Sequence, residues 1–340
     1  MSSPIEVTDG APTRSLLLSG CRAASGGLHL GHYYGCLYAL PPVANAQMLF
    51  VINDCLQGPE EDIRTSTQLV AEDVLAVAAW AARPVTLLRE SRVREYLSSI
   101  LLELCSATSF RLLAEVHPRS HDVKAGGFAG SVSEYLFPLH QAAYTLGLGI
   151  DIACFNDDNS RFVDFTRKVA RRCNKRFGRH LRTDTKLFPR VPGRLPGWDG
   201  RRMAKANGNT LPLRAAAAEV EMFARKLVGR ADQGATDFGT RPLSETECLY
   251  LKILGEEVPE GVRGNARIEY LADRLSAFLR AIASCRQNGD ESTNRTAAAL
   301  QAGEAAARGL VEKTRLAAGY SHHEPLAQTD PTVALLGGNS

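Results

Sequence analysis

The sequence has few of the features that mark a secreted, membrane-bound or metal-binding protein. Among its 340 residues are eight cysteines, and no two of them stand in the C-x-x-C spacing of a zinc or redox site. The first 14 residues lack the basic start and apolar run of a secretory signal, and no apolar stretch approaches the roughly 18 residues that span a bilayer. We therefore expect a cytoplasmic protein with reduced thiols, no membrane partner and no metal held by its own side chains.

Neither sign of charge dominates the chain. Its 40 basic and 37 acidic residues leave a net charge of +3, so DNA is not an expected partner and RNA binding would depend on a local cluster of charge. One such cluster lies between residues 160 and 182, and its members are Arg161, Arg167, Lys168, Arg171, Arg172, Lys175, Arg176, Arg179 and Arg182. These charges are enough to meet an RNA backbone, yet an ordinary solvated helix face carries the same pattern.

What the sequence does contain is an alternation of short apolar runs with helical stretches. The runs lie at 15–20, 48–52, 85–88 and 150–155, and the helical stretches at 31–43, 61–82 and about 92–147. This βαβ pattern is typical of α/β proteins with a doubly wound parallel sheet, in which ligands bind at the carboxyl ends of the strands. It predicts a Rossmann-like domain over residues 14–212, with a helical insertion at about 92–147.

Beyond residue 212, apolar residues recur at helical spacing. The segments that show it are 214–228, 243–254, 265–284 and 292–318. We expect an all-helical second domain over residues 213–320. Residues 1–13 and 321–340 are expected to be disordered tails, because both are loose in composition and glycine-containing.

The first chemical motif stands where the first predicted strand gives way to a helix. It reads Gly26-Gly27-Leu28-His29-Leu30-Gly31-His32, and we call residues 29–32 the histidine turn. Free N–H groups at a helix start bind phosphates, glycine lets a nucleotide approach the backbone, and histidines donate hydrogen bonds to phosphate charge. Nucleotidyltransferases outside tRNA biology use similar turns, and the histidines could also do no more than cap a helix.

The second motif lies about 170 residues later, in a segment rich in glycine and proline. We call residues 195–211 the lysine loop; its centre reads Met203-Ala204-Lys205-Ala206-Asn207-Gly208. We expect this loop to be mobile, so that Lys205 can swing onto a pyrophosphate leaving group when charge develops there. Together the two motifs predict the activation of an amino acid with ATP.

On these motifs the chain resembles class I aminoacyl-tRNA synthetases, and most closely the tryptophanyl-tRNA synthetase family, over nearly its whole length. The histidine turn is similar to the family's HIGH signature, and residues 202–206 stand where the family has KMSKS. Residues 137–144 resemble the helix of the family's amino-acid pocket. Residues 156–159 and 164–174 resemble its nucleotide-contacting turn and the helix that follows.

The resemblance implies roles for individual residues. His29, His32 and Lys205 would be catalytic. The ATP-binding residues would be Ser25, Gly31, His32, Asn156, Asp157, Asp158, Arg202, Met203, Ala204, Lys205 and Ala206, with Mg²⁺ screening the phosphates. The amino-acid pocket would comprise Leu18, Gly20, Phe137, Gln141, Tyr144, Phe155 and Asn159. The implied partners are an amino acid, tRNA and a second copy of the chain.

The sequence departs from the family's pattern in the lysine loop and in the expected amino-acid pocket. Arg202, Ala204 and Ala206 replace the lysine and two serines of KMSKS, so two hydroxyl donors are lost. Tyr144 stands where the tryptophan enzymes have an aspartate that accepts the indole N–H. The remaining pocket changes are Phe137 for a tyrosine, Asn159 for a glutamine and Phe155 for a small aliphatic residue.

These departures leave three functions open. The first is activation of tryptophan or a related amino acid and its transfer to tRNA. The second is a divergent paralogue that forms the adenylate of a different amino acid for a biosynthetic or resistance pathway. The third is a catalytically silent tRNA-binding protein, favoured by the two lost hydroxyls.

Overall fold

The computed structural model describes residues 14–23, 26–38, 46–55, 60–117, 131–154, 160–188, 195–232, 240–286 and 289–320. Both expected tails, 1–13 and 321–340, lie outside these ranges. No single helix in the described ranges is long and apolar enough to cross a membrane; one bent pair, residues 90–107 with 110–116, passes that test by length and composition together.

A sheet of five parallel strands lies at the centre of the molecule, in the order β3-β2-β1-β4-β5. The strands are β1 (Ser15–Arg22), β2 (Ala46–Asn53), β3 (Val85–Arg89), β4 (Ile152–Ala153) and β5 (Lys186–Leu187). The predicted doubly wound α/β fold is therefore confirmed. The sequence did not predict β5, because two residues are too few to show a period in hydrophobicity.

Successive side chains of β2 pack into two separate hydrophobic cores, one on each face of the sheet. Phe50 and Ile52 pack into one cluster, and Leu49 and Val51 into the other. Burial on both faces is why the central strands read as continuous apolar runs rather than as alternating ones.

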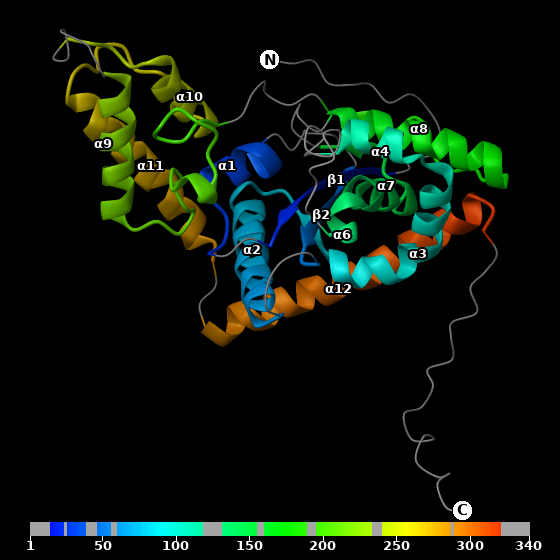
Figure 1. Ribbon diagram of the computed structural model, residues 1–340. Coiled ribbons are helices and arrows are strands. Elements are labelled where there is room, and N and C mark those ends of the chain that lie inside the picture. Colours follow the sequence, from blue (N-terminus) through cyan, green and yellow to red (C-terminus); the bar gives the residue numbers. More distant parts are fainter. Residues whose placement is uncertain are drawn as a thin grey trace, which may run out of the picture.

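Helices cover both faces (Figure 1). They are α2 (Glu60–Trp80), α3 (Glu90–Ala107), α4 (Phe110–Val116), α6 (Val132–Tyr135), α7 (Phe137–Gly147) and α8 (Ser160–Phe177). α3, α7 and α8 pack on one another and form the second core, whereas α2 lies in the first. The helix predicted at 31–43 begins as α1 (Leu30–His32) and continues as a π-helical segment, η1 (Tyr33–Tyr38).

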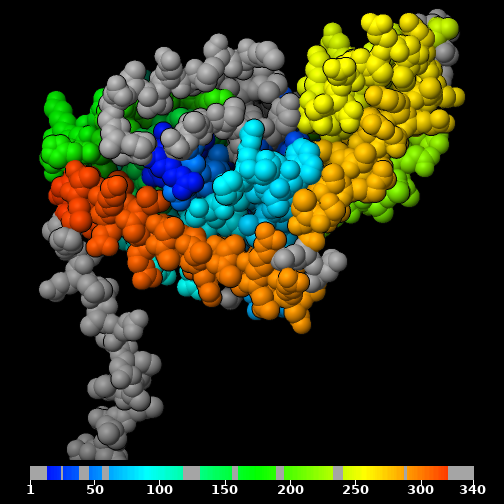
Figure 2. Space-filling view, turned by 180° about the vertical axis from the view of Figure 1, so that it is seen from behind, coloured from blue at the N-terminus to red at the C-terminus, as the bar shows by residue number. Residues whose placement is uncertain are grey.

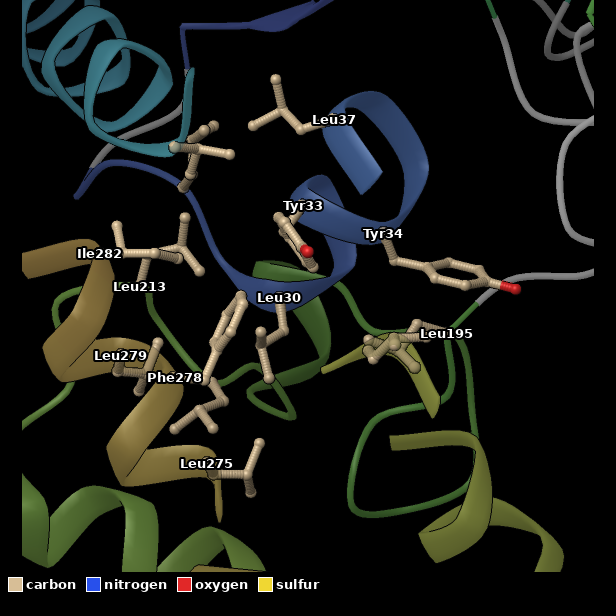
Figure 3. Close-up of a cluster of buried hydrophobic side chains, with 14 of the residues drawn as sticks. Leu30, Tyr33, Tyr34, Leu37, Leu195, Leu213, Leu275, Phe278, Leu279 and Ile282 are labelled. Atoms are coloured by element: carbon tan, nitrogen blue, oxygen red, sulfur yellow. The ribbon is translucent and has the colours of Figure 1, made fainter. Parts of the chain in front are cut away.

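The helices α9 (Ala217–Ala231), α10 (Glu245–Ile253) and α11 (Ala266–Ser284) form a group at one end of the molecule (Figure 1). This group shares the first core with the histidine turn. Figure 3 shows Leu30 and Tyr33 facing Phe278 of α11, and the rings of Tyr33 and Phe278 have centroids 5.0 Å apart.

The last helix, α12 (Gly289–Ala317), leaves that group and returns to the sheet. It packs against β3, α3 and α2, and in Figure 2 its orange residues cross the face turned toward the viewer. The contact with the strand is close: a Cβ on Gly303 would lie 1.7 Å from the carbonyl oxygen of Leu87. Glu304 also forms an ion pair with Arg89 at the end of β3. The helices expected as one domain over 213–320 thus have two packing partners, and the domain boundaries stay a prediction.

Candidate active site

A cavity of about 590 Å³ opens at the carboxyl end of β1, where ligands of doubly wound sheets bind. The histidine turn, the lysine loop and α7 meet there. Of the residues expected from the sequence, those that line it are Leu18, Gly20, His29, Gly31, His32, Phe137, Gln141, Tyr144, Arg202, Met203, Ala204 and Lys205. Ala206 is described but does not line it. Ser25, Phe155, Asn156, Asp157, Asp158 and Asn159 lie outside the described residues.

The histidine turn is held by hydrogen bonds among its own residues. The imidazole of His29 accepts a hydrogen bond from the Gly31 N–H (3.1 Å), and the His29 N–H donates to Nδ1 of His32 (3.4 Å). Their rings lie with centroids 3.8 Å apart. A Cβ on Gly31 would lie 2.9 Å from the His29 ring and 3.3 Å from Cβ of Met203, so any larger residue would displace the imidazole. Both histidines do cap a helix, and they also line the cavity.

Both imidazoles are neutral at pH 7 in this protein. Burial lowers the pKa of His29 to about 2, and the neighbouring His32, when protonated, and the positive charges of Lys205 and Arg202 lower it further. Burial also lowers the pKa of His32 to about 4, with Lys205 and Arg202 contributing. Neutral imidazoles meet an incoming anion as hydrogen-bond donors, through their N–H groups, rather than as cations.

The lysine loop lies against the histidine turn. Nζ of Lys205 donates a hydrogen bond to the carbonyl of Gly27 (2.9 Å). The Gly31 N–H also lies 3.1 Å from Sδ of Met203, and a backbone hydrogen bond joins Leu30 to Leu211 (2.9 Å). Burial lowers the pKa of Lys205. The chain therefore brings a cation to the turn although the two motifs are about 170 residues apart.

A buried amide holds the backbone of the lysine loop beside Ala204. Asn209 is fully buried, and its Oδ1 accepts a hydrogen bond from the Ala204 N–H (2.9 Å). Its Nδ2 donates to Asp199 (2.6 Å) and to the carbonyl of Arg202 (3.0 Å). The loop is therefore described in one hydrogen-bonded conformation, and its mobility stays a prediction.

Sequence reasoning missed Asp73, the carboxylate that anchors the segment before the histidine turn. Asp73 lies on α2, is fully buried, and accepts a hydrogen bond from the Leu28 N–H (2.8 Å). Arg214 (2.9 Å) and Arg286 (3.1 Å) pair with the same carboxylate. The available signal was an aspartate inside the apolar face of a helix, where an unpaired charge would be costly.

Beside Tyr144, which lines the cavity, lies an ion pair that the sequence did not reveal. Glu90, the first residue of α3, is buried beside Tyr144, and Arg94 pairs with it (2.7 Å). Burial raises the pKa of Tyr144, and the charge of Glu90 raises it further. Four buried polar atoms here have no hydrogen-bond partner among the described residues: Glu90 Oε2, Arg94 Nε, Gln141 Oε1 and Tyr144 OH. Such atoms are costly unless a ligand or water pairs with them.

No group of three histidine, cysteine or acidic side chains in the described ranges is arranged to hold a metal ion. Arg161, at the start of α8, also lines the cavity and was not among the expected ATP-binding residues.

Known proteins resemble the chain over most of its length. Residues 13–277 match the family described as tRNA synthetases class I (W and Y). The tryptophan--tRNA ligase of Clostridium longisporum is 26% identical over 229 residues, which cover 63% of this chain and 65% of that enzyme. The match thus spans just under two thirds of that relative's length. The tryptophan--tRNA ligase of Thermotoga maritima is 27% identical over 233 residues, covering 64% of this chain and 70% of that enzyme.

Solved structures share the fold. Tryptophanyl-tRNA synthetase from Campylobacter jejuni, complexed with ADP and tryptophan, superposes with a TM-score of 0.70 at 19% identity and covers 88% of this chain and 97% of that one. Tyrosyl-tRNA synthetase from Archaeoglobus fulgidus, complexed with L-tyrosine, gives 0.57 at 18% identity, covering 80% and 90%. The chain belongs to the class I tRNA synthetases of the tryptophan and tyrosine group, and its relatives are tryptophanyl-tRNA synthetases.

Proposed function

We propose that the chain activates an amino acid with ATP and transfers the aminoacyl group to tRNA. The observation that supports this most directly is the meeting of Lys205 with the histidine turn, where Nζ lies 2.9 Å from the Gly27 carbonyl oxygen. A cation and two imidazoles at one cavity are suited to stabilise charge that moves onto a pyrophosphate leaving group. Family membership supports the same chemistry.

In the first step, a carboxylate oxygen of the amino acid attacks the α-phosphorus of ATP. An O–P bond forms, the bond from that phosphorus to the bridging oxygen breaks, and its electron pair leaves with pyrophosphate. Lys205, His29 and His32 stabilise the leaving group by charge and hydrogen bonds. We expect Mg²⁺ to enter with the triphosphate, and Ser25 and residues 156–158 to complete the nucleotide site.

In the second step, a ribose hydroxyl at the end of the tRNA attacks the carbonyl carbon of the adenylate. A new ester bond forms, the bond to the phosphate oxygen breaks, and AMP leaves with the proton of the hydroxyl on its phosphate. No protein nucleophile is needed in either step, since the chain positions the reactants and stabilises charge.

The amino acid is tryptophan or a related one in this proposal. The Campylobacter jejuni structure contains tryptophan, which favours an aromatic substrate. The pocket favours the second candidate, a paralogue with altered specificity, because Tyr144 stands where the tryptophan enzymes are expected to have an aspartate, and Tyr144 OH and Gln141 Oε1 are buried polar atoms of the cavity lining without a described partner. Against a silent protein stands Asn209, which holds the loop backbone at Ala204 without the serines.

The test is ATP–pyrophosphate exchange with each of the twenty amino acids. We expect one amino acid, or a few related ones, to support exchange, and Lys205→Ala to lower its rate about 10²- to 10³-fold, as the loss of one charge-stabilising group does. Lys313→Ala, on the exposed side of α12, is the matched control and should leave the rate unchanged. Exchange with none of the twenty would disprove the proposal for these substrates. Exchange without charging of total tRNA would favour the paralogue.

A further inference from the structure

The peptide group between Gly27 and Leu28 is hydrogen-bonded at both ends by charged side chains. Its N–H donates to Oδ2 of Asp73 (2.8 Å), and its C=O accepts from Nζ of Lys205 (2.9 Å). The peptide bond is trans, so its N–H and C=O point in opposite directions. Asp73 and Lys205, which are far apart in the sequence, therefore lie on opposite sides of a single peptide group.

The signs of these two charges match the dipole of the peptide group between them. The carboxylate of Asp73 faces the N–H, which is the positive end, and the ammonium of Lys205 faces the C=O, which is the negative end. Hydrogen bonds linked in this way polarise and strengthen one another. Burial lowers the pKa of Lys205, and the charge of Asp73 acts in the opposite direction, so the carboxylate also helps to keep the lysine positively charged.

The backbone at Gly27 allows the carboxylate to come this close. Its φ of +74° lies in the left-handed region that favours glycine, and a Cβ at this position would lie 2.6 Å from Oδ2 of Asp73. Any larger residue at Gly27 would therefore push the carboxylate away from the peptide N–H.

Two arginines hold the Asp73 carboxylate in place. Its Oδ1 accepts a hydrogen bond from Nε of Arg214 (2.9 Å) and pairs with Arg286 (3.1 Å), whereas Oδ2 faces the Leu28 N–H. Asp73 is fully buried on α2 and is not among the described residues that line the cavity. It therefore acts on the reaction through the groups that it holds, not by contact with a substrate.

We propose that Asp73 is a positioning residue, which holds Lys205 at the cavity by fixing the orientation of the Gly27–Leu28 peptide group. The inference rests on the proposed function, in which Lys205 stabilises the pyrophosphate leaving group. Lys205 lines the cavity beside the histidine turn, so an ammonium held at the Gly27 carbonyl is in place before the nucleotide enters. A charge placed in advance stabilises the transition state without further reorganisation.

The rival explanation is that Asp73 supports the histidine turn and has no effect on Lys205. The two explanations differ in a double-mutant cycle, because a residue that acts through Lys205 loses its effect once Lys205 has been replaced. The test therefore compares Asp73→Ala, Lys205→Ala and the double variant with the wild type, all as the full chain. Pyrophosphate exchange measures kcat and KM, and thermal unfolding shows that each protein is folded at the assay temperature.

A second readout does not depend on catalysis. Acetic anhydride labels lysine side chains, and mass spectrometry of the labelled peptides gives the reactivity of Lys205 relative to the exposed Lys313. The matched control is Asp232→Ala. Asp232 is also a buried carboxylate paired with two arginines, Arg241 and Arg267, but it lies in the group of helices that contains α9.

We expect Asp73→Ala to lower kcat about tenfold while KM for the amino acid changes by less than about twofold, because a displaced cation affects the transition state more than substrate binding. In the Lys205→Ala protein the same substitution should change kcat by less than about twofold. Labelling of Lys205 should rise at least about threefold in Asp73→Ala, since its hydrogen-bonded position is lost. Asp232→Ala should lower Tm but leave kcat and the labelling of Lys205 unchanged.

An equal loss of kcat from Asp73→Ala with and without Lys205, unchanged labelling of Lys205, or the same changes in Asp232→Ala would each overturn the inference. If Asp73→Ala does not fold, Gly27→Ala decides the matter, because it keeps every charge and displaces the carboxylate from the peptide group. The same pattern of kcat and labelling is expected from it, and an equal loss with and without Lys205 would again overturn the inference.

Failure of this inference and failure of the proposed function give different results. If the inference alone is wrong, the wild type still catalyses exchange and Lys205→Ala still lowers its rate. Absence of exchange in the wild type would disprove the proposed function and, with it, the part of Asp73 in adenylation. The labelling of Lys205 reports in either case whether Asp73 holds the lysine.

Discussion

At the scale of single residues, the pocket differs from the chemistry expected of a tryptophan enzyme chiefly at Tyr144. Its hydroxyl is buried, lies beside Glu90 and has no hydrogen-bond partner among the described residues. A buried hydroxyl of this kind is a specificity device when a substrate pairs with it, because an analogue without the matching group leaves it unpaired.

Tyr144→Phe tests whether the substrate uses this hydroxyl. With the amino acid identified by exchange, we expect kcat/KM to fall about tenfold, mainly through KM, because one hydrogen bond is lost. The hydroxyl lies beside the Glu90 carboxylate without a hydrogen bond of good geometry, so the free energy of unfolding should change by less than about 1 kcal/mol. Exchange kinetics of the wild type and the variant measure kcat/KM, and thermal unfolding of the two proteins measures stability. An unchanged kcat/KM would show that the substrate does not contact the hydroxyl.

Residue types and spacing were enough to predict the histidine turn and Lys205, because short motifs keep their chemistry within a few positions. Asp73, Glu90 and Asn209 could not be found in this way. Each acts on a group that lies near it only after folding, as when Asp73 accepts from Leu28, 45 positions away. The roles of Ser25 and residues 155–159, the homodimer and the cytoplasmic location stay predictions.

At the scale of elements, the alternation of strands and helices was predictable because each buried strand is an apolar run and each helix has one apolar face. The sequence pattern does not show which element each helix packs against. α11 and α12 have similar helical patterns, yet α11 packs under the histidine turn and α12 against β3. The packing partner of each helix depends on how the two surfaces fit, and for α12 the fit depends on Gly303.

Gly303→Ala should destabilise the protein by about 3 kcal/mol or more, because its Cβ would lie 1.7 Å from the Leu87 carbonyl and force helix and strand apart. Gly309→Ala, on the same helix with open space around it, is the matched control. It should stabilise the protein by about 0.5 to 1 kcal/mol, since alanine favours helix. Urea unfolding of both variants measures the difference, and equal effects would refute the close contact.

At the scale of the whole molecule, three histidines whose pKa values are lowered make the fold sensitive to acid. Burial lowers the pKa of His29 to about 2 and of His32 to about 4, and burial with the charge of Arg94 lowers that of His140 to about 4. The unfolded chain takes up protons on these residues below about pH 6.5, and the folded chain does not until much lower pH. The stability that these neutral histidines contribute is therefore fully present above about pH 7, and it is lost as the pH falls below about 6.5.

The expected loss is up to about 1.4 kcal/mol per pH unit for each histidine below pH 6.5. Thermal unfolding between pH 7.5 and 5.0 should show a falling Tm, and His140→Leu should make the fall shallower. The exposed His180 supplies a control, His180→Gln, that should leave the slope unchanged. A Tm that stays constant over this range would contradict the burial of these side chains as neutral groups.

Because α12 returns to the sheet, strand β3 is covered only late in the synthesis of the chain. β3 is an edge strand, and the helix that packs against it follows about 200 residues later in the chain. During synthesis the sheet can form its strands early, but β3 lacks this cover until α12 has left the ribosome. An uncovered edge strand is a site where chains associate wrongly. Helix α12 therefore protects strand β3, and the α/β part reaches its final form only after this helix has been made.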